Sequence, residues 1–218
     1  FRKVNDLRKT SPSPMLGGEA INYAVMLAHT WGLKEIVDIY KLLYEELKER
    51  VEKRIGAIEG GEQFRILWRN LKPYYSDYLM KYLELEKKAS IAFEEVNFIH
   101  WDEMDPNEPY KSLAKKMISN PPLGEFNRWL NLTISEGVKE YKIDGVIEFA
   151  HWGCRHLNSG TQILKDALKE LNVPLLILDG DCIDSRDYAD SQVKTRIDAF
   201  LEVLENRRQV KQQWLTRS

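Results

Sequence analysis

Two stretches of sequence, DGVIEFAHWGCRH at residues 144–156 and PLLILDGDCIDSRDY at residues 174–188, decide the fold of this chain of 218 residues. Each begins with an apolar run typical of a buried strand and continues into a loop of polar and charged residues. Residues 161–171, between them, have helical spacing, so a strand-loop-helix unit occurs twice in succession. Because parallel strands place their carboxyl ends along one edge of a sheet, we expect the two loops to face each other across one crevice.

Further apolar runs upstream extend this alternation to the element order β-α-β-α-α-β-α-β-α. The order predicts an α/β fold: a small parallel four-stranded sheet of the flavodoxin or Rossmann kind, with helices on both faces. The second strand contains two glutamates, which favours a place at an edge of the sheet. The predicted strands are residues 64–68, 91–96, 144–150 and 174–178, and the predicted helices include one that ends near 88, then 111–119, 125–141, 161–171 and a last one that ends near 208.

The first 60 residues predict a separate helical segment. Residues 1–10 are amphipathic, and SPSP at residues 11–14 breaks the helix because each proline disfavours helix in the residue before it. Two more helices begin near Gly18 and Leu33. We therefore divide the chain into an N-terminal helical segment, residues 1–60, which holds an inter-domain elbow and two helices, and an α/β domain, residues 61–218.

The composition limits the class of protein. Hydrophobic residues make up 43% of the chain, which is enough for a packed core and excludes a disordered protein. The net charge of -2 offers no basic surplus, so we expect no nucleic-acid partner and no membrane partner. Two cysteines do not make a disulfide framework, so the expected compartment is a reducing cytoplasm.

Cys154 is the residue that offers the widest range of chemistry. It follows a predicted buried strand and Gly153, which leaves room beside the thiol, and it lies among His151, Arg155 and His156. Cationic and donor groups of this kind favour a thiolate. From the residues alone, the thiol can be a nucleophile, a redox thiol, a metal ligand or an inert loop cysteine. A single cysteine cannot hold an iron-sulfur cluster, which takes about four thiolate ligands.

The second loop is acidic, with Asp179, Asp181 and Asp184 close together. Carboxylates after a strand can hold magnesium or act as bases, and the same residues serve equally well to cap turns or helices. His151 and His156 together with Asp181 could bind a divalent metal ion, although their spacing matches no known ligand pattern. These alternatives remain open from the residues alone.

Several motifs resemble the 2-hydroxyacyl-CoA dehydratase and benzoyl-CoA reductase family. The run Asp-Gly-Asp, then Asp-x-Arg-x-Tyr, then Gln-x-x-Thr-Arg-x-x-Ala-Phe is long and fairly specific. It looks more like the dehydratase branch, which includes the 2-hydroxyglutaryl-CoA dehydratase D-component, than like the reductase branch. The matching stretches are residues 144–147, 153–154, 173–174, 179–188 and 192–202, and a weaker match extends back to residues 11–14.

The resemblance implies a role for Cys154. In this family each subunit has two α/β domains, and a [4Fe-4S] cluster between them is held by two cysteines of the N-terminal domain and one of the C-terminal domain. Cys154 matches the C-terminal ligand, so it is the expected metal-binding and cofactor-binding residue. The chain is then the C-terminal domain of a longer subunit, with the other ligands outside it. Cys182 lies where the family places no ligand and is expected to be a neighbouring thiol.

The resemblance also implies a reaction, the removal of water from an (R)-2-hydroxyacyl-CoA to give a 2-enoyl-CoA. In the family, one electron turns the thioester carbonyl into a ketyl radical anion, which expels the hydroxyl group and acidifies the β-hydrogen. A separate ATP-dependent activator protein supplies the electron, and a second homologous subunit completes the enzyme. His151 and His156 are candidate catalytic residues by type and location only. Neither the acyl group nor the general base follows from the sequence.

Two other functions stay open. The chain could belong to a benzoyl-CoA-reductase-type subunit, in which the same cluster would pass electrons to an aromatic ring. It could also be a non-catalytic, flavodoxin-like binding module, since the loops contain no evident acid/base pair. Because the other cluster ligands are expected elsewhere, we predict that the chain of 218 residues alone binds no intact cluster and shows no turnover.

Overall fold

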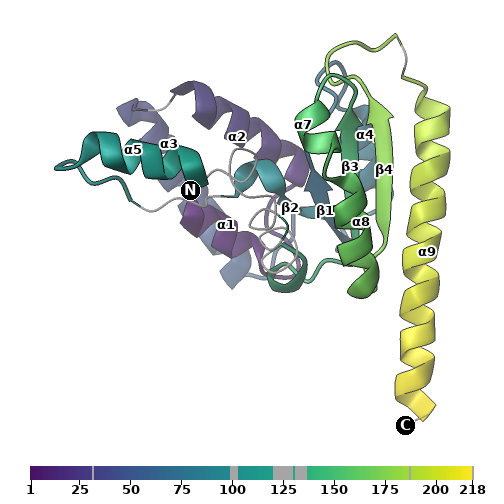
Figure 1. The fold of residues 1–218 in the computed structure, drawn as a ribbon. Coiled ribbons are helices and arrows are strands. Elements are labelled where there is room, and N and C mark those ends of the chain that lie inside the picture. The colour runs from purple at the N-terminus through teal and green to yellow at the C-terminus, as the bar shows by residue number, and fades with distance from the viewer. Residues whose placement is uncertain (31, 99–102, 120–129, 131–136, 187, 218) are drawn as a thin grey trace.

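The computed structural model describes residues 1–30, 32–98, 103–119, 130, 137–186 and 188–217, and within them it shows the predicted α/β fold (Figure 1). Four parallel strands form one sheet in the order β2-β1-β3-β4. The order reverses between β1 and β3, a topological switch point of the kind at which open α/β sheets bind ligands. The strands are β1 (Phe64–Arg69), β2 (Ala89–Glu94), β3 (Gly145–His151) and β4 (Leu175–Gly180).

Helices precede, connect and follow the strands. The N-terminal helices are α1 (Arg2–Arg8), α2 (Gly17–Thr30) and α3 (Lys34–Glu52). Those that join or follow the strands are α4 (Tyr78–Lys81), a π-helical turn η1 (Tyr82–Glu86), a 3-10 turn η2 (Glu95–Asn97), α5 (Pro109–Ser119), α7 (Arg155–Asn158), α8 (Thr161–Glu170) and α9 (Asp190–Arg217). The last helix runs well past its predicted end near residue 208, because the Arg, Lys and Gln residues that follow are good helix formers.

Helices cover both faces of the sheet, as predicted, and each face has its own core. Successive side chains of a strand point to opposite faces. Trp68 therefore packs with Phe200 of α9 in one cluster, whereas its neighbour Leu67 packs with Leu164 of α8 in another. In Figure 1, α8 and α9 lie on opposite sides of β4. The helices lie over the two faces of the sheet and leave the edge formed by the carboxyl ends of the strands uncovered.

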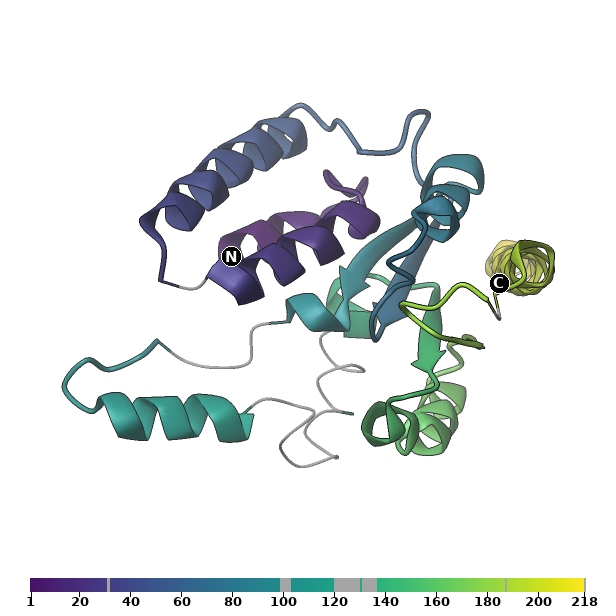
Figure 2. The same cartoon turned by 90° about the horizontal axis from the view of Figure 1, so that it is seen from above.

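The edge position of β2 is confirmed, but a glutamate at that edge does not signal exposure. Glu94 is 0% exposed, and its carboxylate accepts hydrogen bonds from Arg8 of α1 at 2.5 and 2.6 Å. The N-terminal helices cover this edge of the sheet, and Figure 2 shows them on the side away from α9. The charge is tolerated because a buried guanidinium neutralises it.

The N-terminal segment also has a core of its own. Its apolar members come from all three helices and include Val4, Ala20, Ile36 and Leu47. Glu84 of η1 connects this segment to the α/β part of the chain. Its carboxylate accepts hydrogen bonds from the first two backbone N–H groups of α2 at 2.7 and 2.9 Å. The division into residues 1–60 and 61–218 stays a prediction.

Some predicted features lie outside the described residues. These are most of the predicted helix at 125–141 and Asp187 of the Asp-x-Arg-x-Tyr motif. Among the described residues, no helix combines the length and the apolar character that crossing a membrane requires.

Candidate functional site

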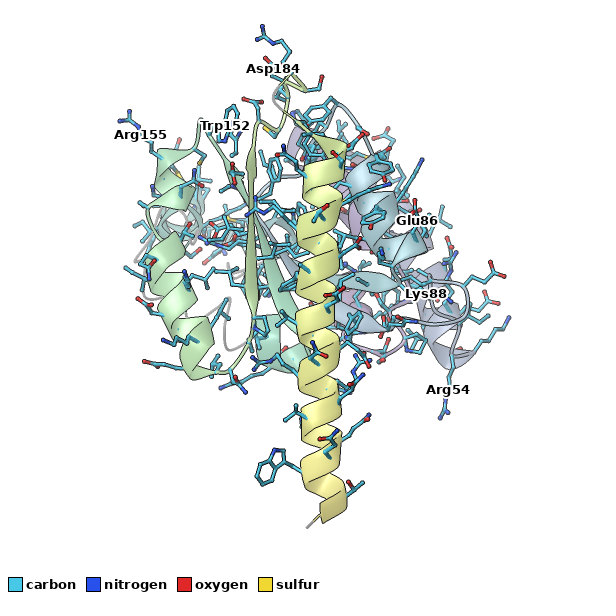
Figure 3. All side chains as sticks on the ribbon, turned by 90° about the vertical axis from the view of Figure 1, so that its right-hand side faces the viewer. Arg54, Glu86, Lys88, Trp152, Arg155 and Asp184 are labelled. Carbon is cyan, nitrogen blue, oxygen red and sulfur yellow. The ribbon has the colours of Figure 1, made fainter. Side chains whose placement is uncertain are left out.

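The loops after β1, β3 and β4 meet at the carboxyl edge of the sheet. The backbone N–H of Trp152 donates to the carbonyl of Gly180 at 3.1 Å, so the two predicted loops do lie together. The N–H of Tyr74 donates to the carbonyl of Cys182 at 2.7 Å, which brings in the β1 loop as well. Figure 3 shows Trp152 and Asp184 at this end of the molecule. The edge is therefore built from three loops rather than the two that we predicted.

Cys154 lies at the turn between β3 and the short helix α7. Its N–H donates to the carbonyl of His151 at 3.0 Å, and its own carbonyl accepts the N–H of Asn158 at 3.2 Å. The Asn158 side chain closes the turn by donating to the His151 carbonyl at 2.9 Å. Cys154 is a free, half-buried cysteine. Its thiol belongs to a fixed turn at the sheet edge and is not enclosed in the core.

Only one of the three predicted cationic neighbours packs into this edge. Arg155 and His156 are exposed, and Figure 3 shows Arg155 projecting outward. A Cβ atom at Gly153 would lie 3.0 Å from Nε2 of His151, so the histidine ring takes up part of the space that this glycine was expected to leave beside the thiol. His151 is thus the predicted site residue that the fold holds in place.

The ring of His151 faces the β4 loop through its other nitrogen. Nδ1 accepts the backbone N–H of Cys182 at 3.3 Å and lies 4.0 Å from Oδ2 of Asp181. An accepting Nδ1 carries no proton, so the proton of the neutral ring is on Nε2. The side chains of His151 and Asp181 are 20% and 30% exposed, which places this contact just below the surface.

The acidic loop uses its carboxylates to build turns, one of the two alternatives left open above. Oδ1 of Asp181 accepts the N–H groups of Ile183 at 2.7 Å and Asp184 at 2.9 Å. These backbone hydrogen bonds hold the pKa of Asp181 below its ordinary value. Asp184 in turn accepts the N–H of Arg186 at 3.0 Å. The turn leaves Oδ2 of Asp181 directed at His151.

Cys182 lies underneath this turn. It is 4% exposed, and burial raises the pKa of its thiol. Tyr75 and Tyr188 pack edge to face beside it, with ring centroids 5.5 Å apart. Burial raises the pKa of Tyr75 to about 12, and its buried hydroxyl has no hydrogen-bond partner. Sequence reasoning noted Cys182 but not its closeness to His151.

A buried ionic cluster near the switch point was missed entirely. Arg69, the last residue of β1, donates to Glu148 of β3 at 2.8 Å and lies 3.4 Å from Glu95. Thr161 at the start of α8 donates to the same Glu148 oxygen at 2.8 Å. Burial raises the pKa of Glu148, and it raises that of Glu95 to about 7. The sequence did contain a signal for this cluster, because Arg69 and Glu148 are charged residues within otherwise apolar strands.

Comparison of the sequence with known proteins identifies the family of the chain. The sequence pattern of the family described as "2-hydroxyglutaryl-CoA dehydratase, D-component" matches residues 1–204. The chain belongs to this family. The match covers the stretches that carried the resemblance and the N-terminal helices as well.

The relatives of the chain are dehydratase subunits. It is 26% identical over 207 residues to the (R)-2-hydroxyisocaproyl-CoA dehydratase alpha subunit of Clostridioides difficile, covering 92% of this chain and 49% of the relative. It is 23% identical to the lactoyl-CoA dehydratase subunit alpha of Anaerotignum propionicum, covering 94% and 49%. For the (R)-phenyllactyl-CoA dehydratase alpha subunit of Clostridium sporogenes the identity is 25%, covering 90% and 47%. The chain thus spans about half the length of these relatives.

Proposed function

We propose that this chain is the cluster-bearing C-terminal half of a dehydratase subunit, which removes water from an (R)-2-hydroxyacyl-CoA to give a 2-enoyl-CoA. The observation that carries the proposal is the place of Cys154, half-buried on a fixed turn at the carboxyl edge of the sheet. Family membership supports the reaction class, and the partial coverage of the relatives supports a longer subunit.

The residues present could supply one of the protein ligands of a [4Fe-4S] cluster. Such a cluster takes about four ligands, and this chain has two cysteines, so the other ligands would come from outside it. Cys154 would be the ligand from this half. When bound, the cluster would supply a single electron to the thioester carbonyl of the substrate.

The residues around Cys154 would then serve the substrate and its protons. His151 carries its ring proton on Nε2, the nitrogen that faces Gly153, so it is placed to donate toward the Cys154 turn. His156 is exposed in α7, two residues after Cys154, and is the second candidate for proton transfer. Trp152 is 51% exposed at the same edge and offers an apolar surface to an acyl group or a partner.

Two protein partners follow from this proposal. A second homologous subunit would complete the enzyme, and an ATP-dependent activator protein would deliver the first electron. The names of the relatives as alpha subunits support a partner subunit. The acyl-CoA would bind where the open sheet edge faces the rest of the enzyme.

Iron content tests the proposal. The natural subunit, purified without oxygen, is expected to hold about four iron atoms. Cys154→Ala should lose most of that iron, whereas Cys182→Ala, a change at the neighbouring thiol, should retain it. Full iron in Cys154→Ala would overturn the assignment of the ligand.

Substrate assays test the reaction. With partner and activator present, 2-hydroxyacyl thioesters should be dehydrated and aromatic thioesters should not be reduced. Reduction of an aromatic ring would favour a benzoyl-CoA-reductase-type subunit. A colourless, air-stable natural subunit indifferent to both thioesters would favour a non-catalytic binding module.

A further inference from the structure

We propose that His151, Asp181 and Cys182 form a binding site for a divalent transition-metal ion of the zinc class, separate from the cluster ligand Cys154. The three residues come from the end of β3 and the loop after β4. One imidazole nitrogen, one carboxylate oxygen and the thiol sulfur all lie within 4.8 Å of one another. Because Cys154 is not among the ligands, the proposal stands apart from the dehydratase function.

Asp181 supplies the first argument. Its Oδ1 is occupied by the two backbone N–H groups of the turn, at 2.7 and 2.9 Å. Its Oδ2 lies 4.0 Å from Nδ1 of His151, which is too far for a hydrogen bond. Metal bonds to nitrogen and oxygen are about 2.0–2.2 Å long, so two ligands of a tetrahedral ion lie roughly 3.4 Å apart. The two atoms are slightly farther apart than that, and a small rotation of either side chain would let them share an ion.

The Nδ1 atom of His151 is oriented to bind a metal ion. It accepts a long hydrogen bond of 3.3 Å from the N–H of Cys182, so its lone pair points toward the β4 loop, and a bound ion would replace this hydrogen bond. Metal ligation by histidine uses the neutral ring and this lone pair. The backbone places the ring there without distortion, because Gly153 has no side chain to meet it.

Cys182 decides which ion fits. Cys182 as a whole is 4% exposed, so an ion held by its thiol is shielded from water on one side. A thiolate together with an imidazole selects zinc-like ions, whereas magnesium and calcium prefer oxygen ligands alone. The more exposed side chains of His151 and Asp181 leave the opposite side open for a fourth ligand. Three protein ligands and one open position are typical of catalytic zinc sites.

The ion would have a definite effect on the neighbouring turn. It would join the end of β3 to the β4 loop through side chains, in addition to the backbone hydrogen bond between Trp152 and Gly180. With Nδ1 on the metal, the proton of His151 stays on Nε2 and faces the turn that holds Cys154. The site would thereby fix the direction in which His151 donates.

Titration of the metal-free chain with cobalt(II) tests the proposal, because cobalt bound to a thiolate gives a ligand-to-metal charge-transfer band that zinc then removes. The wild-type chain and Cys154→Ser should both show the band. Cys182→Ser should lose it. Asp181→Asn keeps an oxygen for the turn but replaces the ligand oxygen Oδ2 with an amide nitrogen that does not bind metals, and it should weaken cobalt affinity at least about 10-fold. Circular dichroism should show that each variant is folded.

The opposite pattern would overturn the site. Absence of the band in the wild-type chain, or its loss in Cys154→Ser with retention in Cys182→Ser, would show that no ion binds through Cys182. Displacement of cobalt by magnesium as readily as by zinc would contradict the thiolate ligand. None of these results bears on the iron content of the natural subunit, so failure here is distinguishable from failure of the dehydratase assignment.

Discussion

The guanidinium of Arg8, in α1, lies 2.5 Å from the carboxylate of Glu94 at the end of β2, although 86 residues separate the two in the chain. Both side chains are almost completely buried, at 1% and 0% exposed. Asn97 donates to the same carboxylate at 2.8 Å. This ion pair holds the N-terminal helices against the edge of the sheet. The helices cover β2, so that its backbone is not exposed to pairing with another chain.

Removing Arg8 should therefore be costly. Arg8→Met leaves Glu94 buried without its counter-ion and should lower the free energy of unfolding by about 3–5 kcal/mol, as measured by urea denaturation. The double variant Arg8→Met, Glu94→Gln should recover much of this loss, because no buried charge remains. Lys41→Met, which breaks the exposed pair with Asp38, should cost less than about 1 kcal/mol. Equal losses in the buried and exposed variants would refute this account.

Stability should fall as pH rises from about 4.5 to about 7. Burial raises the pKa of Glu95 and that of Glu84 from 4.5 to about 7, so in this window the folded protein binds more protons than the unfolded chain. Each carboxyl adds a slope of up to about 1.4 kcal/mol per pH unit, and its contribution is complete below pH 4.5. Glu95→Gln should flatten the curve of unfolding free energy against pH without abolishing the slope. An unchanged curve would contradict the raised pKa of Glu95.

Two glycines should differ in their tolerance of a methyl group. A Cβ atom at Gly17 would lie 2.3 Å from Cβ of Ile91, next to rigid backbone, whereas at Gly153 the nearest atom is the tip of the His151 ring at 3.0 Å. Gly17→Ala should lower the free energy of unfolding by at least about 1–3 kcal/mol. Gly153→Ala should cost less, because the ring can turn aside. Thermal unfolding of both variants measures the difference, and a larger loss at Gly153 would be the contrary result.

The two thiols should differ in reactivity. Cys154 is half-buried, whereas Cys182 is 4% exposed and burial raises the pKa of its thiol. Reaction with a thiol reagent near pH 8, with the metal removed, should show a fast phase and a slow phase. Cys154→Ser should abolish the fast phase and Cys182→Ser the slow one. The reverse assignment would mean that the β4 loop opens more readily than its hydrogen bonds indicate.

Much of the fold could be predicted because it depends on local signals. The apolar run before His151 and the one before Asp179 gave β3 and β4 to within a few residues, and the polar loops gave their carboxyl ends. Parallel pairing then placed the two loops together. The turn-forming role of Asp181 also follows from local chemistry, since an aspartate accepts the N–H groups of the residues directly after it.

The remaining features needed the tertiary structure, because they join residues that no local rule connects. The strand order β2-β1-β3-β4 places Arg69 beside Glu148, and the N-terminal helices place Arg8 on Glu94. The closeness of His151 to Cys182 likewise depends on how β3 and β4 pair.

The sequence by itself determined the family, the kind of sheet and the edge at which the chemistry lies, since periodicity and turn residues act over a few positions. Only the tertiary structure decided which charges are buried in pairs and which ligand atoms converge. Those outcomes depend on the free energy of packing the whole chain, which favours a buried charge or thiol only where a distant partner meets it.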